Sequence, residues 1–269
     1  MKRGILAFSN GILILSFLCL FFACKNIDNK DDQTSQSFIL FKDTTEPDAE
    51  VRKKQVIYQD HTENIIYTST ETATSIAVSS VSKELLYYKT EIDVFSDLAE
   101  NEYLFIKETD SFCGFAKKNF YKKYLEGEQC VPEETAITTA ETYLNLYISD
   151  FKQYDRIACQ YSKSDGYYQM QYCRPLNGIL TDDIITVFIQ ADGQLGAFTA
   201  FKHGAYHDIH ISEEAIAQAR QAAASITDPL MYEYITSSEE GIILLQYHEV
   251  SENGYSRAVP SAFVLQPAQ

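Results

Sequence analysis

Three of the five histidines lie close together in the segment KHGAYHDIHIS, where they could bind a transition metal. Imidazole nitrogens are common metal ligands, and His203, His207 and His210 share this segment with Asp208. In a strand, positions 207 and 210 would face opposite sides of the sheet, and in a helix Gly204 would disturb the turn that joins 203 to 207. The spacing therefore favours a polar loop, and we predict no metal site.

The remaining polar clusters also lack a recognisable chemical pattern. Asp182, Asp183 and Asp192 could bind calcium, but their surroundings lack the spaced carboxylates and central glycine of an EF-hand loop. The sequence contains no GxSxG, no HExxH and no glycine-rich phosphate loop. We therefore expect no catalytic residue and no cofactor, so the protein should not be an enzyme. A hydrolase would require titratable groups that converge beside a nucleophile.

The first 24 residues carry the strongest signal in the chain. A basic start at Lys2 and Arg3 precedes an apolar run over 4–23, and the chain turns polar after Cys24. This pattern predicts a signal peptide or lipid-anchor segment over 1–24 in which Cys24 becomes lipidated, followed by a polar tether over 25–36. We therefore expect a lipid-anchored protein on the extracytoplasmic face of the cell membrane.

Two alternatives to lipidation remain open. Ala23 suits a lipoprotein signal, but Phe21 stands where such signals usually carry leucine. The apolar run has about the ~20 residues that span a bilayer, so it could stay as an uncleaved membrane helix. The product could also be freely secreted. All three interpretations place the folded part outside the cytoplasm.

The charge of the chain excludes some partners. The sequence has 22 basic and 38 acidic residues, for a net charge of −16. Nucleic-acid binding needs a basic patch, so we expect no nucleic-acid partner. Attraction to anionic lipid is also disfavoured, so contact with the membrane should come from the lipid or the N-terminal helix. The acidic residues are dispersed, which is typical of a solubilising surface.

Four cysteines follow the export segment, an even number that suggests disulfides in an exported protein. Of the three possible pairings we predict Cys113–Cys130 and Cys159–Cys173, because each pair is close in sequence. The second pair also flanks a hairpin whose turn is KSDG. The alternative is that some of these residues are free buried thiols. Neither a CxxC pair nor a Cys/His zinc spacing occurs in the sequence.

The elements that would position these residues are mostly strands. The chain has 19 Tyr and 16 Phe, and its alternating apolar segments predict strands between tight turns such as Asp192-Gly193. We predict helices over 107–126, after Pro132 and after Ser212, where acidic residues favour a helix start. We expect strands at 38–41, 56–60, 64–70, 75–92 (two strands), 156–162, 166–174, 176–202 (several strands), 241–250 and 255–266. We predict two units: an N-terminal β-rich unit over 37–106 and a C-terminal α+β unit over 107–269.

The second half of the chain resembles a known family. PEETAITTAETYL, then paired strands, then NGILTDDIITVFIQADGQLGAF and HISEEAIAQA, is similar to PepSY-type extracytoplasmic domains over about 131–225. The resemblance implies an α+β fold of tandem PepSY-like units, with antiparallel sheets and helices packed on one face. It implies a non-catalytic module, since some members inhibit peptidases or restrain membrane sensor kinases.

These observations together predict a membrane-anchored, extracytoplasmic, non-catalytic binding or regulatory module. Its partner would be a protein or peptide, possible targets being a peptidase or a membrane sensor. The alternative is a receptor for a small molecule or cell-wall fragment, which a deep aromatic pocket would favour. Tyrosine doublets at 87–88 and 167–168 could line such a groove or pack in the core.

Overall fold

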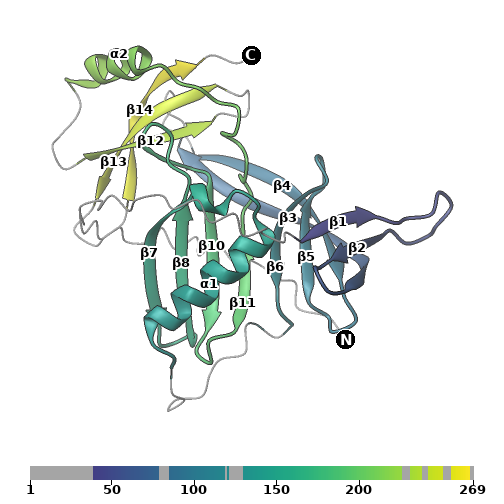
Figure 1. Cartoon of the computed structure of the whole chain (residues 1–269). Helices are drawn as coiled ribbons and strands as arrows, with labels where there is room; N and C mark the ends of the chain where they lie inside the picture. The colour runs from purple at the N-terminus through teal and green to yellow at the C-terminus, as the bar shows by residue number, and fades with distance from the viewer. Residues whose placement is uncertain are drawn as a thin grey trace. The chain divides into compact units, whose positions relative to one another are not determined.

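A computed structural model describes residues 39–78, 85–118, 120, 130–225, 231–237, 242–250 and 256–266 (Figure 1). The predicted export segment 1–24, with Cys24, and the tether 25–36 lie outside these described residues. The chain divides into two compact units. We call residues within 36–75 and 88–209 the large unit, and the described residues within 76–87 and 210–269 the small unit.

One antiparallel sheet dominates the large unit. In spatial order its strands are β1 (Leu40–Asp43), β2 (Lys53–Ile57), β3 (Thr62–Val78), β4 (Leu85–Ser96), β5 (Glu102–Ile106), β6 (Ser111–Ala116), β11 (Leu195–Thr199), β10 (Ile184–Gln190), β8 (Tyr167–Cys173) and β7 (Asp155–Ser162). Antiparallel pairing joins β1 to β2, β2 to β3 and β4 to β5, and it continues from β5 through β6, β11, β10 and β8 to β7. The strands on either side of residue 106 are therefore neighbours in one sheet. Short elements over Phe151–Gln153 (η1) and Leu180–Thr181 (β9) connect them along the chain.

The alternation of apolar residues explains how this sheet forms its core. On β10, Ile185, Val187 and Ile189 are fully buried, and the residues between them are only partly buried. Their partners across the ladder are Tyr172, Met170 and Tyr168 of β8, which are also buried. The predicted two-residue periodicity and the predicted Asp192-Gly193 turn are thus confirmed. Gly193 has φ +83°, a conformation that glycine adopts without steric cost.

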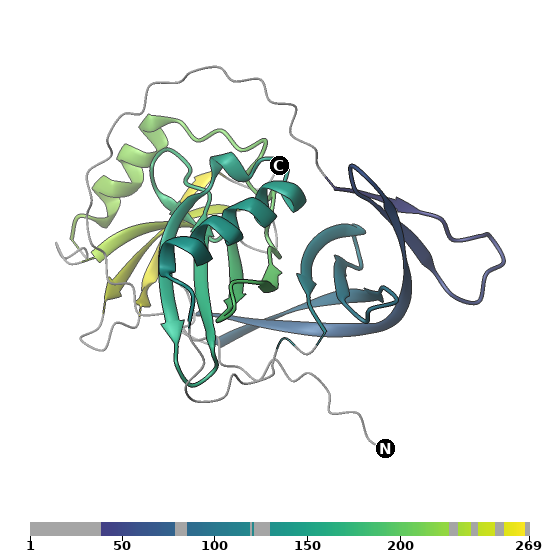
Figure 2. The ribbon, with the colours of Figure 1, turned by 60° about the horizontal axis from the view of Figure 1, so that its bottom comes forward.

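Helix α1 (Glu133–Tyr147) covers this face of the sheet, as both ribbon views show (Figures 1 and 2). It follows Pro132 and opens with Glu133 and Glu134, so the predicted helix start is confirmed. Ala136, Ala140 and Leu144 recur every four residues and are completely buried, in one cluster with the apolar residues of β8 and β10. The small alanine side chains let the helix approach the sheet closely.

The predicted helix over 107–126 is wrong in its described part. Residues 111–116 form strand β6 between β5 and β11. At its centre, a β-carbon on Gly114 would lie 2.7 Å from the carbonyl oxygen of Phe198 on β11. The close pairing of two strands therefore requires glycine here, and this long-range contact overrides a weak local helical pattern.

The predicted fold class is also wrong. We expected α+β tandem units with antiparallel sheets and helices packed on one face. The protein is instead sheet-rich and mostly antiparallel, and its described residues contain only two α-helices among fourteen strands. The reason is that β1 to β6 are neighbours in the sheet in chain order, and the described residues between them contain no helix.

The small unit contains helix α2 (Glu213–Ala223) and a sheet of β12 (Met231–Ser237), β13 (Ile243–Val250) and β14 (Ser256–Gln266). The hydroxyl of Ser212 accepts a hydrogen bond from the backbone N–H of Ala215 and caps the helix, which confirms the helix predicted after Ser212. Strand β14 is an edge strand, and its register with β13 shifts around Pro260. An edge position suits a strand that contains proline, because proline has no backbone N–H to donate to a second neighbour.

In the described part of the chain, no helix has the length and apolar character needed to cross a bilayer.

The packing of α1 predicts a large effect of truncation at Leu144. Leu144→Ala should lower the free energy of unfolding by about 2–5 kcal/mol, because it opens a cavity in a fully buried contact. Leu98→Ala is the matched control, since Leu98 is 98% exposed and should change stability by less than about 0.5 kcal/mol. Urea unfolding followed by tyrosine fluorescence measures both. Equal stabilities for the two variants would contradict this account of the core.

Candidate functional site

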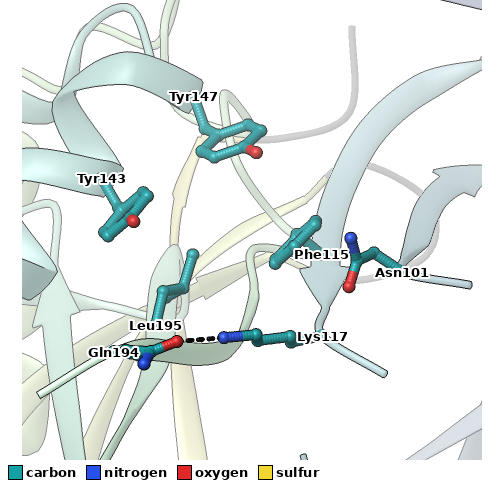
Figure 3. A pocket seen from close by; sticks show the side chains of 7 residues that line it. All are labelled: Asn101, Phe115, Lys117, Tyr143, Tyr147, Gln194 and Leu195. Atoms are coloured by element: carbon teal, nitrogen blue, oxygen red, sulfur yellow. Dashed lines mark hydrogen bonds between the residues drawn. The ribbon is translucent and has the colours of Figure 1, made fainter. Parts of the chain in front are cut away.

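A small hollow opens between the last turns of α1 and the sheet of the large unit (Figure 3). Its volume is about 150 Å³. Three aromatic rings, one aliphatic side chain, two amides and one amine surround it: Phe115, Tyr143, Tyr147, Leu195, Asn101, Gln194 and Lys117. No carboxylic acid, histidine, cysteine or serine is among these lining residues, and the polar groups are the amine of Lys117, two tyrosine hydroxyls and two amides.

Four separate elements bring these side chains together. Tyr143 and Tyr147 are four residues apart on α1 and so lie on the same side of the helix (Figure 3). Phe115 lies on β6, and Lys117 follows the strand and donates its backbone N–H to the Gly196 carbonyl of β11 (2.7 Å). The hollow therefore exists only when the helix and these strands have assembled.

The amide of Asn101 is held in place before β5. Its backbone N–H and its side-chain amide both donate to the carboxylate of Asp97, at 2.9 and 2.8 Å. Its side-chain oxygen accepts from the backbone N–H of Lys118 at 3.1 Å. Because these bonds fix the amide orientation, the Asn101 side of the hollow is preorganised.

The floor of the hollow is a rigid aromatic cluster. The rings of Phe115 and Tyr147 stack at 5.8 Å between centroids, and Tyr147 also contacts Phe198 at 5.2 Å. Burial, together with the nearby Tyr58 hydroxyl, raises the pKa of Tyr147, so it remains a neutral phenol. Tyr143 at the rim is 37% exposed. An incoming apolar group would thus meet a fixed floor and a more accessible edge.

Lys117 supplies a positive charge at the rim. Its Nζ donates a hydrogen bond to the Gln194 side-chain oxygen (Figure 3). Within the described residues no carboxylate forms an ion pair with Lys117, although the chain has a net charge of −16. The hollow therefore combines an apolar floor with a cation that can bind an external carboxylate.

The histidine segment forms turns, and aspartate side chains form hydrogen bonds with it. His203 and His207 both lie beside Asp150, a residue that sequence reasoning missed because it is more than fifty positions away. Asp208 is exposed, and His210 belongs to the small unit. Of the three histidines considered in this segment, His203 and His207 thus lie together and His210 lies apart from them.

The other candidate aspartates have structural partners. Asp183 is completely buried, and it accepts hydrogen bonds from the Tyr154 hydroxyl (2.7 Å) and the Gly204 backbone N–H (3.3 Å). Burial raises the pKa of Asp183. Asp182 pairs with Lys202 and with the Tyr206 hydroxyl. Asp192 accepts from the backbone N–H of Gln194 within its turn (3.0 Å).

One tyrosine doublet is part of the core. Tyr168 is buried, and its hydroxyl donates to the Val131 carbonyl at 2.8 Å. Tyr167 points to the other face, where its ring contacts Phe120 and Phe188. Tyr168 therefore packs in the core, whereas Tyr167 is partly exposed on the opposite face of the sheet. The side chains of the doublet at 87–88 lie outside the described residues.

Neither predicted disulfide is formed, since all four cysteines are free. Cys159 lies opposite Met170 and packs in the core beneath α1, whereas Cys173 lies three positions further along β8 and contacts Thr181. Cys113 and Cys130 likewise belong to different apolar clusters. Pairing by closeness in sequence failed because the sheet holds the members of each pair in separate places.

The free thiols predict a distinct labelling pattern. Burial raises the pKa of Cys113 to about 12 and that of Cys173 to about 11, so both should resist iodoacetamide in the folded protein. In urea, without any reductant, all four cysteines should be alkylated, as read by peptide mass spectrometry. Peptides that become alkylated only after reduction would show that disulfides exist and would contradict the structure.

Comparison with known proteins shows no family membership. No family model matches the sequence, and no curated protein matches it. A solved structure titled "Bacillus megaterium YpeB C-terminal domain" is similar to this chain with a TM-score of 0.35 and 13% sequence identity. The match covers 74% of this chain and 91% of that chain. A likeness at this level is weak, and the PepSY-type resemblance stays a prediction from the sequence pattern.

Proposed function

We propose that this protein is a membrane-anchored, extracytoplasmic, non-catalytic module that binds a peptide segment of a protein partner at the hollow beside α1. The observation that carries the proposal is the pairing of an aromatic floor with the rim amine of Lys117. A peptide with an apolar side chain beside a carboxylate would place the side chain on the aromatic floor and the carboxylate against the Lys117 amine. A C-terminal apolar residue with its free carboxylate has this chemistry too.

The size of the hollow supports a peptide rather than a small molecule. Pockets for drug-sized ligands typically enclose about 300–1,000 Å³, and this hollow encloses about 150 Å³. That space is suited to one side chain inserted from a larger partner. A deep aromatic pocket would have favoured the alternative, a receptor for a small molecule or cell-wall fragment. The small hollow favours a peptide-binding module over such a receptor.

A regulatory role would follow if the bound segment belongs to a peptidase or a membrane sensor, as the PepSY-type resemblance implies. Lipidation at Cys24 would keep the module beside such a membrane partner, and residues 25–36 would tether it. Both parts of this proposal come from the sequence pattern.

Binding can be tested by selecting a random peptide library on the immobilised full chain. Enriched peptides should carry an apolar residue beside a carboxylate. For such a peptide, Lys117→Gln should raise the Kd about tenfold, which is the ~1.4 kcal/mol of one charge-assisted hydrogen bond. Tyr143→Ala should also weaken binding, because it removes the rim contact. Fluorescence anisotropy with a labelled peptide measures each Kd.

Lys107→Gln is the matched control for Lys117→Gln. It removes the same charge from an exposed lysine that pairs with Glu91 and does not line the hollow. Its Kd should equal that of the unmodified chain. The proposal fails if no peptide is enriched, or if enriched peptides bind the Lys117 and Tyr143 variants as tightly as the parent.

The anchor has its own test. Cys24→Ser should abolish incorporation of radiolabelled palmitate in a bacterial host and should move the protein from the lipid-modified to the unmodified form on gels. Cys19→Ser should leave labelling unchanged, since bulky Leu18 precedes it. Absence of labelling in the parent chain, with the protein still in the membrane fraction, would point to an uncleaved helix and rule out lipidation.

A further inference from the structure

Asp150, His203 and His207 bring three metal-binding groups to one place in the large unit. His203 Nε2 lies 2.7 Å from Asp150 Oδ1, and His207 Nε2 lies 2.5 Å from Asp150 Oδ2. The ligand atoms of all three residues lie within 4.8 Å of one another. Residues from two distant parts of the chain thus direct nitrogen and oxygen atoms at a common point.

Residues 201–208 form turns, so neither the strand nor the helix considered in the sequence analysis describes the histidine segment. Gly204 has φ +82°, which lets the chain reverse between the two histidines. A β-carbon at this position would lie 3.4 Å from His207 Nδ1. The backbone N–H of Gly204 donates to the buried carboxylate of Asp183, which anchors the segment. Both imidazoles consequently face the Asp150 carboxylate.

Asp150 lies just beyond the C-terminal end of α1. It follows α1 and precedes η1, and its side chain is only 11% exposed. Arg174 donates from one guanidinium nitrogen to Asp150 Oδ2 at 3.0 Å and from another to Gln153 at 2.5 Å. The two carboxylate oxygens of Asp150 are thus held in a fixed orientation by contacts with Arg174, His203 and His207.

We propose that Asp150, His203 and His207 form a binding site for a divalent transition metal of the zinc class. Two imidazoles and one carboxylate are a ligand set that zinc uses, with metal–ligand distances of about 2.0–2.2 Å. The ion takes the place of the Nε2 protons that face Asp150 in its absence, so each ring then keeps its proton on Nδ1 and binds the ion through the Nε2 lone pair. Oδ1 of Asp150 is the carboxylate ligand, while Arg174 holds Oδ2 as an outer partner.

Two features allow an ion to enter. Tetrahedral ligands at these distances are roughly 3.3 Å apart, so the 2.7 Å contact between His203 Nε2 and Asp150 Oδ1 must lengthen, and His207 Nε2 must turn from Oδ2 toward the ion. The His207 side chain is 41% exposed and can make this adjustment. The surrounding charges also favour a cation, because Asp182 and Asp183 accompany Asp150 and offset Arg174 and Lys202. Exposure at His207 leaves a fourth coordination position open to solvent or to a partner's ligand.

Metal binding can be measured on the untagged full chain in detergent by equilibrium dialysis against ZnCl₂. One zinc ion per chain is expected, and Co²⁺ should give the visible absorption bands of a tetrahedral site with nitrogen and oxygen ligands. His207→Gln should weaken zinc binding by at least about tenfold, and Asp150→Asn should do the same. His210→Gln is the matched control, since it removes a histidine from the same segment but outside the cluster.

Folding of the variants is checked without metal by circular dichroism. His207 is the primary position for the test because its exposed side chain tolerates replacement. Zinc should raise the Tm of the parent and of His210→Gln, but not that of His207→Gln. The proposal is overturned if the parent binds no zinc, which would make the cluster a hydrogen-bonded brace. It is equally overturned if His210→Gln loses zinc and His207→Gln retains it.

Discussion

The packing of α1 on the large sheet is the contact on which the rest of the large unit depends. Ala136, Ala140 and Leu144 are completely buried against apolar side chains of the sheet. Burying a leucine side chain contributes about 1.5–3 kcal/mol, and the two alanines make the close approach possible. This contact determines the position and rotation of the helix, and therefore the direction of every side chain near its end.

Both candidate sites lie at the C-terminal end of this helix. Tyr143 and Tyr147 leave its last turns to line the hollow, and Asp150 follows three residues after the helix ends. The two sites differ in chemistry, because the hollow offers apolar surface and one amine whereas the second site offers imidazoles and a carboxylate. The end of one helix thus positions residues of both candidate sites.

Polar contacts stabilise the sheet further from the helix. Asp93 is 2% exposed, and its carboxylate accepts from Arg52 at 2.7 Å and from the Thr70 hydroxyl at 2.6 Å. The Arg52 guanidinium also lies over the Tyr67 ring, 4.2 Å from its centroid. Removing the Asp93 carboxylate would leave these donors without their acceptor, so the cluster links β3 and β4 to the segment before β2. The same principle operates at Asp183, whose buried carboxylate anchors the histidine turns.

Local interactions explain what sequence analysis could predict. The helix start at Glu133, the Ser212 cap and the Asp192-Gly193 turn each depend on residues within a few positions of one another. Alternation along β10 likewise reflects the pleat of one strand. Features of this kind are encoded in short segments, and the structure confirms them. The export segment is also a local pattern, and it remains a prediction because it lies outside the described residues.

The tertiary structure decided the rest, because it depends on contacts between residues far apart in the chain. Segment 111–116 is a strand because β5 and β11 pair with it, and its own residues carried a weak helical pattern. The four cysteines stay free because the β7–β8 register separates Cys159 from Cys173, and Cys113 and Cys130 pack in different apolar clusters. Asp150 joins His203 and His207 only through the assembly of helix, sheet and turns. The sequence by itself determined the turns, caps and periodicities, whereas the fold class and both sites required the long-range packing that no local pattern contains.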